Sequence, residues 1–225
     1  MDFFVAGVIH HDPLGPDKLT DWLRTLRQAH ADPPAFIAVE FASYVFQQIR
    51  EQRGTLEQLA QREWPEASPE LIRALAPSLA YEADTHPEVF RQHIEVLWLD
   101  EFRQPEPYPG AAQDFARDRL CTYKSLLLNE ELSLPIPDAL ATMSQAAWDK
   151  ADRESRENPP QPEPRDEEFA LQITQRLRQG GGEWAIAVVG RNHASDQEGS
   201  MLRRLLDGGI PCNKAILDPR NLPSG

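Results

Sequence analysis

Lysine and arginine are scarce in this chain of 225 residues: 23 of them stand against 36 aspartates and glutamates, and the formal net charge is -13. Nucleic-acid binding needs clustered basic side chains against the phosphates, and docking on anionic lipid needs the same sign of charge. The charge balance therefore argues against a nucleic-acid or membrane partner. Long apolar runs are also missing, since no stretch approaches the roughly 20 residues that a membrane span needs.

Cysteine is rarer still, because only Cys121 and Cys212 occur. They have no spacing typical of metal ligands, and no disulfide framework surrounds them. No basic segment precedes the first apolar run, so a signal peptide is not expected. These absences predict a cytoplasmic protein. The length is that of one sizeable α/β domain, which we expect to cover residues 1–225.

The chain does contain three short, continuous apolar runs, over residues 3–9, 35–39 and 184–190. Runs of this length bounded by turn residues are typical of strands buried on both faces of a parallel sheet. Helical spacing of apolar residues between the first two runs completes a βαβ unit, which implies parallel strands. The predicted fold is an α/β three-layer sandwich with a mainly parallel central sheet and helices on both faces.

The middle of the chain has helical periodicity and predicts a helical insertion over roughly residues 55–150, between the second and third core strands. Residues 149–164 are charged and rich in proline, which predicts an exposed connection. A helix is expected from Asp166 to the glycines at 180–182. Another is expected to begin at Ser195, where Ser-Asp-Gln-Glu is a capping-box pattern. A last strand is expected near residues 213–217.

Each of the three apolar runs is followed by an ionisable residue. Gly7-x-x-His10 closes the first run, Glu40 follows the second, and Gly190-x-x-His193 closes the third. Ligands of an open parallel sheet sit in the crevice beyond the carboxyl ends of its strands. We therefore expect the two histidines and the glutamate to converge in one pocket there. The two glycines would let the backbone or a ligand approach closely.

Two histidines and one carboxylate suit catalytic zinc, or iron, manganese or cobalt, with positions left open for water. A divalent metal ion held by His10, Glu40 and His193 would lower the pKa of bound water and supply a nucleophile near neutral pH. Plainer interpretations stay open. A histidine at a strand end is more often a hydrogen-bonded structural residue. Glu40 could also form a buried ion pair with Arg165 or Arg191.

Several neighbouring residues have two interpretations each. His11 and Asp12, which follow His10, are either groups that support the site or residues of a turn. Asp166 either belongs to the site or caps a helix. Ser195 is interpreted as a helix cap, because the sequence has no Gly-x-Ser-x-Gly elbow of a serine hydrolase.

The paired Gly-x-x-His motifs, with Val39-Glu40 between them, resemble the TraB/Tiki group and its relatives, the ChaN-like iron proteins and the erythromycin esterases. Arg165-Asp166 is also similar to the Arg-Asp element that starts the helix before the last motif in ChaN-like and TraB-like proteins. The resemblance covers roughly the first 50 and the last 60 residues. It implies that His10, Glu40 and His193 take part in metal-dependent peptide hydrolysis, as in Tiki-type members.

The first functional hypothesis is a metal-dependent hydrolase whose metal-activated water attacks a peptide, amide or ester bond. In it, Arg165 orients Glu40 or stabilises developing negative charge. One alternative is a non-catalytic iron- or haem-binding protein of the ChaN type. Another is a metal-free hydrolase of the erythromycin-esterase type, with His10 as general base. The expected partner is a small-molecule or peptide substrate. The sequence determines neither the substrate, nor the metal, nor the oligomeric state.

Overall fold

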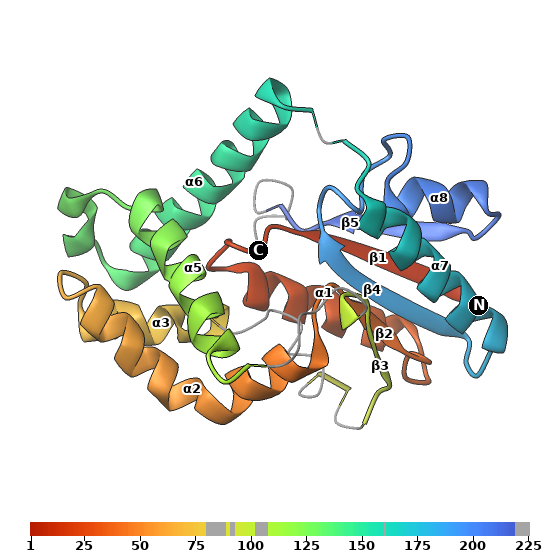
Figure 1. Ribbon diagram of the computed structural model, residues 1–225, viewed down its shortest axis with the longest axis horizontal. Coiled ribbons are helices and arrows are strands. Elements are labelled where there is room, and N and C mark those ends of the chain that lie inside the picture. Colours follow the sequence, from red (N-terminus) through yellow and green to blue (C-terminus); the bar gives the residue numbers. More distant parts are fainter. Residues whose placement is uncertain (80–88, 91–92, 102–107, 160, 219–225) are drawn as a thin grey trace.

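A five-stranded, all-parallel sheet forms the centre of the molecule, with the strand order β3-β2-β4-β1-β5 (Figure 1). The computed structural model describes residues 1–79, 89–90, 93–101, 108–159 and 161–218. The strands are β1 (Asp2–Val8), β2 (Ile37–Val39), β3 (Val96–Trp98), β4 (Trp184–Gly190) and β5 (Cys212–Ile216). The predicted α/β class and parallel sheet are confirmed.

The helices lie on both faces of this sheet and to one side of it (Figure 1). They are α1 (Gly15–Ala29), α2 (Ser43–Glu63), α3 (Pro69–Leu79), α5 (Ala111–Leu126), the 3-10 helix η3 (Asn129–Ser133), α6 (Ile136–Glu157), α7 (Pro164–Gln179) and α8 (Met201–Asp207). Helix α1 packs on one face of the sheet, and α7 and α8 pack on the other. This is the expected three-layer arrangement.

The two central strands show why continuous apolar runs are needed at this position. Successive side chains of a strand point to opposite faces. In β4, Ile186 and Val188 face the core that contains α1, whereas Ala187 and Val189 face the core that contains α7 and α8. Every residue from Trp184 to Val189 is buried. Both faces of β4 are therefore covered, so polar side chains cannot alternate with apolar ones along this strand.

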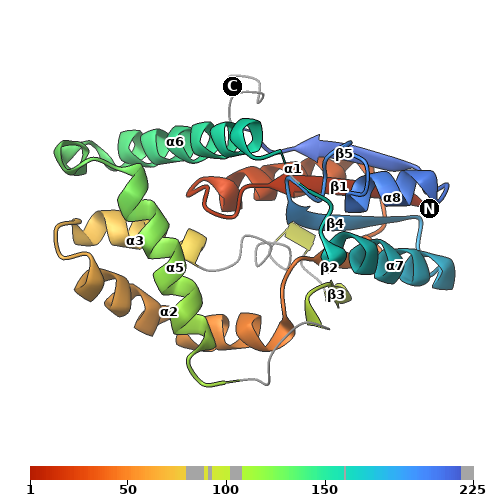
Figure 2. The same cartoon turned by 45° about the horizontal axis from the view of Figure 1, so that its top comes forward.

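A third core packs the remaining helices against one another. Leu75 of α3, Tyr123 of α5 and Met143 of α6 are all buried within it. Helix α6 runs from this helical part towards the sheet (Figure 2). Within the described ranges, no helix combines the length and the apolar character needed to cross a bilayer.

Two expectations about the helices were wrong. The segment predicted as an exposed connection, 149–164, is helical as far as Glu157 because α6 continues through it. Its alanine and long charged side chains favour a helix, and the prolines begin only at Pro159. The helix expected from Ser195 begins at Met201 instead, where the Ser200 hydroxyl accepts a hydrogen bond from the Arg203 N–H at 3.2 Å. Ten residues of turn precede it, so no helix begins at Ser195.

One strand lies inside the predicted helical insertion of residues 55–150. Helices α3 and α5 and most of α6 belong to it, but β3 interrupts it and pairs in parallel with β2. Strand β3 has three residues, as β2 does. Its apolar run at 96–99 directly follows apolar residues with helical spacing, so the sequence pattern there predicts a helix. Residues 80–88, 91–92 and 102–107 of the insertion lie outside the described part of the chain.

Candidate functional site

Three adjacent strands, β1, β4 and β2, deliver the predicted site residues to one edge of the sheet. His10 comes two residues after β1, Glu40 directly after β2, and His193 three residues after β4. All three side chains line one pocket of about 540 Å³. The expected convergence is therefore present. It follows from the strand order, because β4 lies between β2 and β1.

The carboxylate of Glu40 is the centre of the site. Its Oε1 accepts a hydrogen bond from Arg165 Nη1 at 3.0 Å and lies 3.1 Å from His193 Nε2. Its Oε2 accepts from the Gly190 N–H at 2.6 Å and lies 3.3 Å from His10 Nε2. Burial raises the pKa of this group, but the two histidines outweigh that effect and hold the pKa of Glu40 well below its usual range. Glu40 is therefore an anion with four hydrogen-bonding partners.

His193 is buried between two carboxylates, with only 5% of its side chain exposed. Its Nδ1 lies 2.8 Å from Asp166 Oδ1, and its Nε2 faces Glu40. Burial lowers the pKa of the imidazole, but the hydrogen bonds to Asp166 and Glu40 and their charges raise it to about 10. His193 is therefore an imidazolium at neutral pH, and both of its ring nitrogens donate hydrogen bonds.

His10 has a different environment, because 28% of its side chain is exposed and it lines the pocket. Since Glu40 is ionised, the contact at Nε2 favours an N–H donating to the carboxylate. The two histidines, which carry the same sequence motif, thus differ: His10 is a partly exposed imidazole, and His193 is a buried cation.

Asp166 contacts the site, but the expectation that it caps the helix was wrong, because Glu163 is the N-cap of α7. Asp166 is the third residue of α7, and its Oδ2 accepts from the N–H of Glu163, the residue that caps this helix, at 2.9 Å. Its Oδ1 accepts from the Met201 N–H at 2.7 Å and also contacts His193. Burial raises the pKa of Asp166, but His193 and the backbone donors lower it overall. The helix end therefore holds the carboxylate that orients His193.

Of the two arginines considered as partners of Glu40, Arg165 is the one that binds it. Arg165 also bonds Glu163, through Nε at 2.8 Å and Nη2 at 2.7 Å. Burial lowers the pKa of Arg165, but the negative charges of Glu40 and Glu163 raise it overall. The guanidinium therefore stays charged and orients Glu40.

Arg191 instead fastens α6 to the end of β4. Its Nη1 donates to Asp152 Oδ1 at 2.6 Å, and its Nη2 donates to the Ala151 carbonyl at 2.9 Å and to the Ser155 hydroxyl at 2.7 Å. All three acceptors lie on α6. The C-terminal part of this helix consequently forms one wall of the pocket, with Glu154 and Asn158 facing into it.

The two motif glycines permit close approaches of different kinds. A Cβ on Gly190 would lie 3.1 Å from Glu40 Oε2 and 3.2 Å from His10 Nε2, so a side chain there would push into the site. A Cβ on Gly7 would lie 2.5 Å from Ile216 Cδ1 and 3.0 Å from Ala194 Cβ. Gly190 thus makes room for the site, and Gly7 makes room for β5 and the turn after β4.

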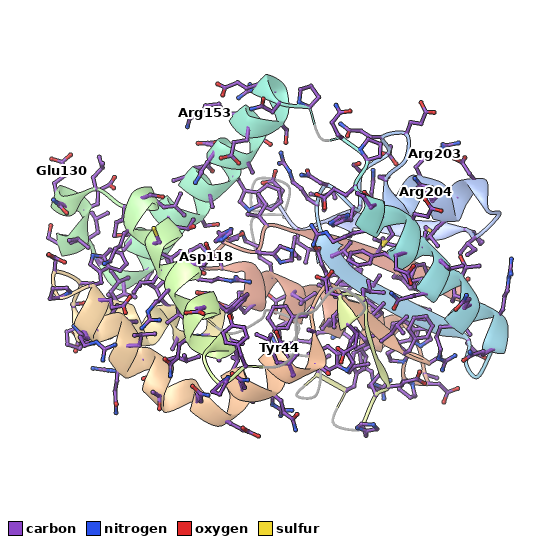
Figure 3. All side chains as sticks on the ribbon, in the orientation of Figure 1. Tyr44, Asp118, Glu130, Arg153, Arg203 and Arg204 are labelled. Atoms are coloured by element: carbon purple, nitrogen blue, oxygen red, sulfur yellow. The ribbon has the colours of Figure 1, made fainter. Side chains whose placement is uncertain are left out.

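His11 points towards the helical part of the molecule. Its Nε2 lies 3.5 Å from Asp118 Oδ2 on α5, and Figure 3 shows Asp118 on that helix. Burial, with the nearby charge of Arg119, lowers the pKa of His11. His11 lines the pocket, and its side chain contacts Asp118. It borders the site without taking part in the Glu40 cluster.

Sequence reasoning missed a buried polar cluster directly behind His10. Asp12 Oδ1 accepts from the Leu14 N–H at 2.9 Å, and its Oδ2 accepts from Trp148 Nε1 at 2.8 Å and from Lys18. Lys18 also donates to Ser144 at 3.0 Å. Asp12 is indeed a turn residue, as its bond to Leu14 shows. Its contacts with α6, more than 130 residues away in the chain, have no local sequence signal.

The described residues at the site are of types that bind divalent metals, but they are not arranged as a set of metal ligands. Each imidazole Nε2 faces a separate oxygen of Glu40, and the same oxygens accept from Arg165 and from the Gly190 N–H. Among the described residues, no three His, Cys, Asp or Glu side chains are arranged to hold a metal ion. The divalent ion therefore stays a prediction.

The raised pKa of His193 makes the stability of the metal-free protein depend on pH. Below pH 6.5 the ring is protonated in both the folded and unfolded states, and between there and about pH 10 only the folded state keeps the proton. The free energy of unfolding should therefore fall as the pH rises through this interval, with a slope approaching about 1.4 kcal/mol per pH unit. Urea unfolding at several pH values would measure it.

The matched control for this titration is His193→Gln, which has no ionisable ring and should lose most of the slope above about pH 7. A wild-type free energy of unfolding that stayed constant over the same interval would contradict the assignment of His193 as a buried cation.

Comparison with models of protein families, with curated proteins and with solved structures found no match.

Proposed function

We propose that this protein is a hydrolase that cleaves an amide, peptide or ester bond, with His10 as the general base. The observation that carries the proposal is the line of contacts from Asp166 through His193 and Glu40 to His10, which ends in a partly exposed imidazole on a pocket. A carboxylate that holds one ring nitrogen of a histidine sets its tautomer and stabilises the imidazolium that forms during proton transfer.

In the first step, the imidazole of His10 takes a proton from a water molecule as the oxygen of that water attacks the carbonyl carbon of the substrate. The carbonyl π electrons move to the oxygen and give a tetrahedral intermediate. His10 then returns the proton to the leaving nitrogen or oxygen as the bond to carbon breaks. The products are a carboxylic acid and an amine or alcohol, and His10 ends neutral. Proton transfer of this kind contributes about 10²- to 10⁴-fold to the rate.

Glu40 supports this step as a charge and not as a base. Four partners keep it ionised, so it is a weak proton acceptor but a fixed anion beside the imidazolium of His10. Preorganised charge of this kind stabilises a transition state without reorganisation at the moment of reaction. Arg165 and His193 position the carboxylate, and Arg165 also lines the pocket where negative charge develops on the substrate.

The test is a panel of amides, esters and short peptides, assayed with protein that has been stripped by a chelator and with the same protein reloaded with zinc, manganese, cobalt or iron. We expect turnover that does not need added metal and that falls at least about a hundredfold in His10→Gln. His93→Gln is the matched control, since His93 is exposed and does not line the pocket. Turnover unaffected by His10→Gln would contradict the proposal.

The metal-dependent hydrolase is the second candidate. It is favoured by the placement of two imidazole nitrogens within 3.3 Å of one carboxylate. Turnover that appears only on reloading, with stoichiometric metal lost in the double variant His10→Ala with His193→Ala, would favour it over the metal-free hydrolase. Haem binding removed by His10→Ala, without hydrolysis of any panel member, would instead favour the iron- or haem-binding alternative.

A further inference from the structure

A smaller cavity of about 150 Å³ opens beside the main pocket, in the seam between α5 and α6. The two share four residues of their linings: Ile9, His11, Ala151 and Glu154. His11 follows His10 directly in the chain, so the shared lining begins one residue from the proposed base. We call this second space the side cavity.

Four of the eight residues that line the side cavity are apolar, namely Ile9, Leu126, Ala147 and Ala151, and the helical part of the molecule supplies most of the lining. Beyond the shared residues, α5 contributes Thr122 and Leu126, and α6 contributes Ala147 and Lys150. Ala147 and Ala151 lie one helical turn apart, so their small side chains leave space on the same face of α6. Leu126 and Ala147 are buried members of the helical core, which makes this a preformed space.

We propose that the side cavity binds a branched aliphatic group of the substrate, about the size of an isobutyl group, next to the bond that is cleaved. The inference rests on the proposed function and specifies its substrate class. The volume corresponds to about five water molecules, or a group of roughly four to six non-hydrogen atoms. The charged side chains of Lys150 and Glu154 are exposed, so they suit the polar part of the substrate and not its aliphatic group.

The energetic consequence is that substrates with a branched aliphatic group should be preferred over substrates with a small one. Each methylene transferred from water into an apolar site is worth about a fourfold gain in affinity. Replacing an acetyl by an isovaleryl group adds three carbons, so the preference should reach at least about tenfold in kcat/KM. The helical part would then decide which substrates the residues at the sheet edge act on.

The binding test uses wild-type protein with ¹³C-labelled Ala, Ile and Leu methyl groups, titrated with isovaleramide and with acetamide. Isovaleramide should shift the methyl signals of Ile9, Leu126 and Ala147 in a saturable manner, and acetamide at the same concentration should not. This measurement needs no turnover, so it remains informative if the proposed hydrolysis fails. Absence of these shifts with isovaleramide would overturn the side cavity as an aliphatic subsite.

Two variants fill the cavity from opposite walls. Thr122→Leu acts from α5 at a half-buried position, and Ala147→Leu acts from α6 at a buried one, so the first remains usable if the second fails to fold. Each should abolish the isovaleramide shifts and lower kcat/KM for isovaleryl substrates at least about tenfold relative to acetyl substrates. The matched control is Arg153→Leu, an exposed position of α6 labelled in Figure 3, which should change neither. Equal losses for both substrates, or retained shifts in both variants, would overturn the inference.

Discussion

Glu40→Gln is expected to lower kcat by about 10³- to 10⁴-fold while leaving substrate binding largely intact. A carboxylate accepts from four donors, whereas the amide that replaces it must present an NH₂ group to at least one of them. The change also removes the negative charge that stabilises protonated His10. Because this stabilisation is needed mainly in the transition state, kcat should fall far more than KM rises.

The measurement is a comparison of kcat and KM for wild-type protein and Glu40→Gln on the best substrate from the panel. Glu70→Gln is the control, since Glu70 is an exposed residue of α3 that pairs with Arg73. Loss of Glu40 should also lower the pKa of His193, which an NMR titration of the imidazole would report even in an inactive variant. Retained kcat in Glu40→Gln would contradict the role assigned to this carboxylate.

Asp12→Ala is expected to have the largest effect on stability, about 3 to 5 kcal/mol. Asp12 is the buried acceptor for Lys18, Trp148 and the backbone of Leu14. Burial already lowers the pKa of the Lys18 ammonium. Removing Asp12 leaves this buried ammonium without its main anionic partner. The turn that carries His10 and the docking of α6 should both loosen.

Chemical denaturation at neutral pH measures this loss, with Asp21→Ala as the control. Asp21 is an exposed residue of α1 that pairs with Arg24 on the surface, so its removal should change the free energy of unfolding by no more than about 0.5 kcal/mol. Trp148→Phe removes one donor and keeps most of the packing, so it should cost less than Asp12→Ala. Equal stabilities for Asp12→Ala and Asp21→Ala would show that the cluster does not fasten α6.

The sequence by itself determined the sheet and the place of the candidate site. Continuous apolar runs predicted β1 and β4, because burial on both faces leaves a local pattern that needs no knowledge of neighbours. The residues that follow the runs, His10, Glu40 and His193, then had to lie at the carboxyl edge, because the strands are parallel. The structure brings all three to one pocket.

The local elements that are predicted wrongly from the sequence are those with weak or mixed sequence patterns. The apolar run of strand β3, at residues 96–99, directly follows apolar residues with helical spacing, which hides the strand. The charged segment up to Glu157 resembled a connection because its polarity is high, yet those residues favour the end of a long helix. The capping pattern at Ser195 was local and plausible, but the backbone there forms turns around His193.

Only the tertiary structure decided what the two histidines are. Both follow a Gly-x-x-His pattern, yet one is accessible and the other is buried between carboxylates that lie 27 and 153 residues away in the chain. A pKa depends on burial and on charges within a few ångströms, and those are set by packing and not by sequence spacing. For the same reason, the Asp12 cluster could not be predicted from the sequence. Its partner on α6 contacts Asp12 only when the helical part packs beside the sheet.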